Sequence, residues 1–112
     1  MIKIESIEEF EQALKENQRF FLLKHSLTCP ISQAAYEEYE SYANSHSETK
    51  HYYLAVQDAR PLSNHIAETY DVKHESPQAI LFNKEAVAWH ASHWKITNDS
   101  LAKALFSNDG SN

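Results

Sequence analysis

The stretch RFFLLK at residues 19–24, followed by HSLTCP at residues 25–30, carries the clearest structural signal in the sequence. Residues 19–24 form a nearly continuous apolar run of strand length, which is typical of a strand buried on both faces of a sheet. A short loop follows, and Pro30 suits the first position of a helix, where its missing N–H costs no hydrogen bond. The sequence therefore predicts a buried strand, a short loop and a helix, with Cys29 at the junction of loop and helix.

Outward from this stretch, the apolar spacing alternates between strand and helix patterns. Residues 2–4 alternate as a short strand, and Ser6 with Glu9 forms a capping-box pattern before a helix that reaches about Glu16. The remaining predicted elements are a helix from Pro30 to about Ser45, a strand over 51–56, a helix from Pro61 to Tyr70, strands over 78–82 and 86–90, and a final helix after Thr97.

This order of elements predicts an α/β fold with a central mixed sheet flanked by helices. Alternating strands and helices give the parallel part of the sheet, and the later hairpin adds antiparallel strands. The order is that of thioredoxin with its N-terminal extension, although other mixed α/β folds share it. A chain of 112 residues is too short for two separate cores, so we predict one domain over residues 1–106 and a frayed polar tail over 107–112.

Charge and glycine content argue against several classes of partner and ligand. The formal net charge of −6 is spread along the chain without clusters of Lys or Arg, which argues against nucleic-acid and membrane-surface partners. Gly110, in the tail, is the only glycine, so the glycine-rich loops that bind nucleotide phosphates are absent. No apolar run is long enough to span a membrane, and the acidic start is unlike a signal peptide. We therefore expect a cytoplasmic protein.

Cys29 is the only cysteine and the main candidate for chemistry. A lone cysteine excludes an intramolecular disulfide and a multi-cysteine metal site. At the start of a helix, its sulfur would face free backbone N–H groups and the positive end of the helix dipole, and both favour the nucleophilic thiolate. The alternative is a buried structural cysteine that acts as a small hydrophobe.

Four further residues are candidates for the same site. Ser32 completes a C-x-x-S motif and could donate a hydrogen bond to the Cys29 thiolate, or could simply be tolerated in the first helical turn. In thioredoxin folds, a cis proline at the place of Ser76-Pro77 leaves the preceding backbone free to pair with substrate. His25, four residues before Cys29, could tune the sulfur, or could be an exposed or core histidine.

The segment around His90 and His93 contains two histidines and two tryptophans. The histidines are not predicted to bind a metal ion, because no second cysteine or acidic pair completes a ligand set. Trp89 and Trp94 flank the two histidines and are predicted mainly as core residues, with rim aromatics beside a binding groove as the alternative.

Two motifs together resemble a known family. KHSLTCPIS at residues 24–32 and WHASHWKIT at residues 89–97 are similar to the YtxJ-type monothiol bacilliredoxins, and Ser76-Pro77 falls where that family has its cis-proline loop. The resemblance extends to about Phe106, with a departure in the turn 83–85, where relatives tend to have glycine.

The resemblance implies a thioredoxin fold and removal of bacillithiol from protein mixed disulfides. Cys29 would be the catalytic nucleophile, Thr28, Pro30 and Ser32 would support its thiolate, and Ser76 and Pro77 would bind substrate. Bacillithiol would be a co-substrate, with no tightly bound cofactor, and the partners would be bacillithiolated proteins and a low-molecular-weight thiol. The alternative function is a non-catalytic redox-sensing or interaction module whose cysteine accepts a small-thiol cap.

Overall fold

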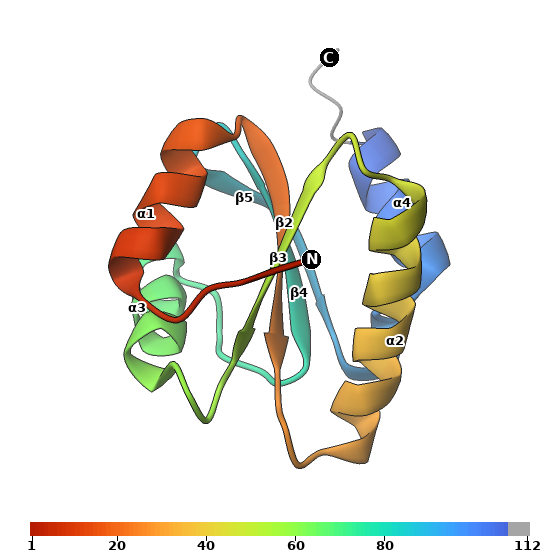
Figure 1. Cartoon of the computed structure of the whole chain (residues 1–112), viewed down its shortest axis with the longest axis horizontal. Coiled ribbons are helices and arrows are strands. Elements are labelled where there is room, and N and C mark those ends of the chain that lie inside the picture. The colour runs from red at the N-terminus through yellow and green to blue at the C-terminus, as the bar shows by residue number, and fades with distance from the viewer. Residues whose placement is uncertain (108–112) are drawn as a thin grey trace.

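The computed structural model describes residues 1–107 (Figure 1). Of the tail predicted over 107–112, Ser107 is the last residue of the final helix, and residues 108–112 lie outside the described part of the chain. Within residues 1–107, none of the helices is long and apolar enough to cross a membrane.

A mixed sheet in the order β1-β3-β2-β4-β5 forms the centre of the molecule. β1, β3 and β2 run parallel, whereas β4 is antiparallel to both β2 and β5. The predicted α/β class, with its mixed sheet, is therefore confirmed. The strands are β1 (Ile2–Lys3), β2 (Arg19–His25), β3 (Lys50–Ala55), β4 (Gln78–Asn83) and β5 (Ala86–Ser92).

Helices cover both faces of the sheet (Figure 1). α1 (Ile7–Glu16) and α3 (Arg60–Tyr70) lie on one face, and α2 (Pro30–Ser45) and α4 (Asn98–Ser107) lie on the other. Successive side chains of residues 20–23 point alternately into the two cores, because strand side chains alternate between faces. All four are fully buried, which explains why this stretch is apolar without interruption.

The end of β5 differs from the sequence prediction. The strand extends through Ser92, because that residue pairs with Gln78 at the start of β4. An unpredicted 3-10 turn, η1 (His93–Lys95), then turns the chain out of the sheet. Trp94 lies on this turn and is 69% exposed, so its assignment to the core is wrong; Trp89 is partly buried against the α2–α4 side.

The turn between β4 and β5 provides a test of backbone strain. Lys84 and Glu85 have φ of 54° and 63°, the left-handed region in which a side chain is unfavourable. We expect Glu85→Gly to raise the free energy of unfolding by about 0.5–1 kcal/mol, because glycine has no Cβ to clash there. Urea unfolding measures this difference.

Glu40→Gly is the matched control, because Glu40 is an exposed glutamate in the middle of α2. It should lower the free energy of unfolding by about 1 kcal/mol, the usual cost of glycine inside a helix. If Glu85→Gly destabilised the protein as Glu40→Gly does, the strain assigned to the turn would be disproved.

Candidate active site around Cys29

The candidate site lies at one end of the sheet, where three strand ends meet. The register pairs His25 with Ala55 at the ends of β2 and β3, and pairs Lys24 with Gln78 at the start of β4. The loop that carries Cys29 follows β2, and the segment that enters β4 lies at the same end of the sheet (Figure 1). The fold thus brings the two segments predicted from sequence to one end of the molecule.

Cys29 is the N-cap residue of α2 and is partly exposed. Its backbone is extended, its C=O accepts the Gln33 N–H over 3.1 Å, and Pro30 occupies the first turn. The sulfur accepts no capping hydrogen bond, and the first turn carries no acidic side chain. Cys29 therefore combines access for a disulfide with the positive end of a helix whose first turn carries no carboxylate.

Ser32 is fully buried and holds the loop that precedes Cys29. Its Oγ accepts the Ser26 N–H over 2.8 Å and lies 2.9 Å from His25 Nδ1. The structure thus places the Ser32 hydroxyl against the loop and His25, and its support of the Cys29 thiolate stays a prediction.

His25 is the last residue of β2, where the sequence analysis placed a loop, because its pairing with Ala55 extends the strand. Burial lowers the pKa of His25, and a hydrogen bond to the Ser32 backbone partly offsets this shift. The ring packs against Tyr36, with 4.8 Å between ring centroids. His25 is thus connected to the Cys29 loop through Ser32. An effect of His25 on the reactivity of the Cys29 sulfur stays a prediction.

We expect Ser32→Ala to lower the free energy of unfolding by about 1–2 kcal/mol. Without the hydroxyl, the Ser26 N–H and His25 Nδ1 lose their partner in a buried place, which costs more than a surface hydrogen bond. Urea unfolding would measure the loss, with Ser45→Ala as the control, because Ser45 is an exposed serine at the end of the same helix. Equal effects of the two substitutions would contradict this role.

Gln57, in the turn after β3, is a site residue that sequence reasoning missed. Its side-chain amide bonds to Ser26, Leu27 and Thr28, the residues directly before Cys29. A glutamine in a polar turn has no distinctive spacing, so no pattern in the sequence indicated this contact.

The bond between Ser76 and Pro77 is cis, as expected. Pro77 is buried, and its C=O accepts the His93 N–H over 3.1 Å. This hydrogen bond ties the segment that enters β4 to the turn that carries the exposed Trp94.

A family model described as monothiol bacilliredoxin BrxC matches residues 2–101. The chain belongs to this family. A solved structure described as having a thioredoxin fold, with a provisional assignment as an oxidoreductase, is 46% identical with a TM-score of 0.87, and the match covers 92% of this chain and 91% of that one. The predicted resemblance to monothiol bacilliredoxins and the thioredoxin fold are thereby confirmed, and the protein is a thiol oxidoreductase by family.

Two thioredoxins share the fold at low identity. The Fasciola hepatica protein is 14% identical with a TM-score of 0.79, and the match covers 96% of this bacilliredoxin and 98% of that chain. The Plasmodium falciparum protein is 10% identical with a TM-score of 0.78, and the match covers 96% of this chain and 99% of that one.

Lys24 is a second feature of this bacilliredoxin that sequence reasoning missed. Its side chain is fully buried, and its ammonium donates to the Ser63 C=O over 3.0 Å and lies 3.4 Å from His74 Nδ1. Burial lowers the pKa of Lys24 to about 8. The pKa of His74 is lowered by its own desolvation and then by the neighbouring positive charges of Lys24 and Arg60.

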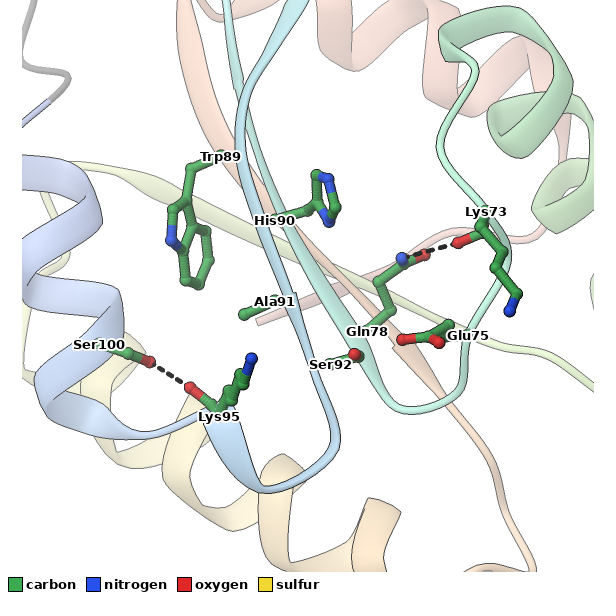
Figure 2. A pocket seen from close by; sticks show the side chains of 9 residues that line it. All are labelled: Lys73, Glu75, Gln78, Trp89, His90, Ala91, Ser92, Lys95 and Ser100. Atoms are coloured by element: carbon green, nitrogen blue, oxygen red, sulfur yellow. Dashed lines mark hydrogen bonds between the residues drawn. The ribbon is translucent and has the colours of Figure 1, made fainter.

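A pocket of about 550 Å³ lies at the free edge of β5 (Figure 2). Lys73 and His90 line it on one side of the strand, and Trp89 and Lys95 line it on the other. Glu75 also lines the pocket, which therefore adjoins the Ser76-Pro77 segment. Across residues 1–107, no group of three or more His, Cys, Asp or Glu side chains is placed to hold a metal ion.

Proposed function

We propose that this protein removes bacillithiol from protein mixed disulfides with Cys29 as its single nucleophile. The observation that carries the proposal is the position of Cys29. In a chain of the monothiol bacilliredoxin family, the only cysteine is partly exposed and occupies the N-cap position of a helix. A thiolate at such a place attacks a disulfide sulfur.

The proposed reaction has two exchange steps. Cys29 attacks the bacillithiol sulfur, the bond between that sulfur and the protein sulfur breaks, and the protein leaves as a thiolate that takes up a proton. Cys29 then carries bacillithiol in a new disulfide. Because the chain has no second cysteine, a thiol from outside must attack the bacillithiol sulfur of this disulfide. Bacillithiol leaves in a new disulfide with that thiol, and Cys29 is released as a thiolate.

The surrounding residues have proposed roles in these steps. Thr28, Pro30 and Ser32 support the Cys29 thiolate by shaping the helix start, and His25 tunes it through Ser32. Ser76 and Pro77 present backbone to the substrate, and the adjoining pocket gives space for the part of the substrate beyond the disulfide. We place the reaction in the cytoplasm, with bacillithiol as co-substrate and no tightly bound cofactor.

Turnover with a bacillithiolated protein tests the proposal. The protein, at one hundredth of the substrate concentration, should release many equivalents of protein thiol when free bacillithiol is present. Mass spectrometry should show bacillithiol on Cys29 when free thiol is withheld. Release of at most one equivalent would instead indicate a redox-sensing module, and equal rates with a glutathione-capped substrate would contradict the choice of bacillithiol.

A further inference from the structure

One side chain from a distant part of the chain holds the loop that carries Cys29. The Leu27 N–H donates to Gln57 Oε1 over 3.1 Å, while Gln57 Nε2 donates to Ser26 Oγ over 3.1 Å and to Thr28 Oγ1 over 3.5 Å. The amide therefore uses both its acceptor and its donor on three consecutive residues. The last of these residues is bonded directly to Cys29.

Gln57 is itself held by the sheet. It follows β3, whose last residue Ala55 pairs with His25 of β2. The Val56 N–H donates to the His25 C=O over 2.9 Å, and Asp58 forms an ion pair with Lys3 of β1 over 3.3 Å. The residues on both sides of Gln57 along the chain thus contact neighbouring strands, so Gln57 connects the Cys29 loop to the central sheet.

The loop is held from two sides, and the two sides differ in burial. Ser32 bonds to Ser26 from within the protein, where a hydrogen bond resists competition from water. The bonds of Gln57 are exposed to solvent. Because water replaces exposed hydrogen bonds at little cost, they contribute little to the stability of the fold. Their effect is on where the loop lies.

We infer that Gln57 is a positioning residue, which aligns Cys29 Sγ with the disulfide bond that it attacks. This inference rests on the proposed exchange function. Attack on a disulfide requires the reacting sulfurs in a defined geometry, and a misplacement of about 1 Å can cost up to about a hundredfold in rate. Alkylation by a small mobile reagent does not need that alignment with a docked protein substrate.

Gln57→Ala tests the inference. Gln12→Ala is the matched control, because it removes an exposed glutamine of α1. We expect Gln57→Ala to lower kcat for a bacillithiolated protein by about tenfold and to change KM little. The rate of iodoacetamide alkylation of Cys29 should stay within about twofold of the parent protein, and the urea midpoint should be unchanged. Gln12→Ala should match the parent protein in all three measurements.

Gln57→Glu keeps the size of the side chain and tests the geometry of the loop. A carboxylate accepts the Leu27 N–H, and the hydroxyls of Ser26 and Thr28 can rotate to donate to it, so the loop keeps its position. Gln57→Glu should therefore recover most of the kcat that Gln57→Ala loses.

Three outcomes would overturn the inference: an unchanged kcat in Gln57→Ala, an equal loss in exchange and alkylation, or a lowered urea midpoint that accounts for the loss.

A second substrate, a protein whose thiol is capped with cysteine, distinguishes the proposed role of Gln57 from the proposed use of bacillithiol. A parent protein that processes only the cysteine-capped substrate would disprove the bacillithiol assignment and still show the effect of Gln57. A parent protein inactive on both substrates would disprove both proposals.

Discussion

Cys29→Ser should abolish thiol–disulfide exchange, with a loss of at least about a thousandfold in turnover. Cys29 is the only sulfur nucleophile in the sequence, and a serine hydroxyl remains protonated and forms no disulfide. The assay is release of protein thiol from a bacillithiolated protein. Residual turnover above a few per cent of the parent rate would mean that the nucleophile is not Cys29.

The same substitution should leave the fold intact. Cys29 is partly exposed, belongs to neither hydrophobic core, and makes no side-chain capping bond. Serine is among the best N-cap residues, so Cys29→Ser should unfold at the same or a higher urea concentration, with a gain of up to about 1 kcal/mol. Cys29→Ala is the matched control: it should be equally inactive and lack this gain.

Lys24→Met should raise the free energy of unfolding at pH 7 by about 2 kcal/mol. Burial lowers the pKa of Lys24 from 10.5 in the unfolded chain to about 8 in the folded protein. Below pH 8 the ammonium is charged in both states, and the desolvation cost amounts to about 3 kcal/mol. Methionine has a similar length and no charge. It loses the hydrogen bond to the Ser63 C=O and the longer contact with His74 Nδ1, which together contribute about 1 kcal/mol.

The difference in stability between Lys24→Met and the parent protein should depend on pH. Between about pH 8 and 10.5 the unfolded chain binds more protons at Lys24 than the folded protein does, so the stability of the parent protein rises with pH through this window. The advantage of Lys24→Met should therefore shrink as the pH increases from 8 towards 10. Urea unfolding at pH 7, 8, 9 and 10 measures it.

Two further measurements check the assignment to Lys24. The pKa of His74, followed by NMR, should rise in Lys24→Met, because one of the positive charges that lower it is gone. Lys15→Met, at an exposed position of α1, should change neither the stability nor its pH dependence in this way. A Lys24→Met protein that is less stable than the parent at pH 7 would show that the buried ammonium stabilises the fold.

Local pattern predicted most of the fold, because the signals that mark these elements act over a few residues. The apolar run at residues 19–24 is buried in both cores, and Pro30 begins α2 with Cys29 as its N-cap. The Ser6–Glu9 capping box forms as its sequence indicates. The prediction failed at η1, where the chain turns on a left-handed His93 and carries Trp94 out of the sheet, because a positive φ at histidine has no pattern in the sequence.

The local sequence pattern is enough to place one cysteine between a buried strand and a helix, because hydrophobic periodicity and proline act over a few residues. The surroundings of that cysteine depend on the tertiary fold. Gln57 reaches the loop across about 30 residues because β2 and β3 pair in parallel, and Lys24 is buried because α3 packs over its end of β2. Such contacts depend on strand register and helix packing. Two segments with ordinary local patterns acquire them only when the fold brings them together.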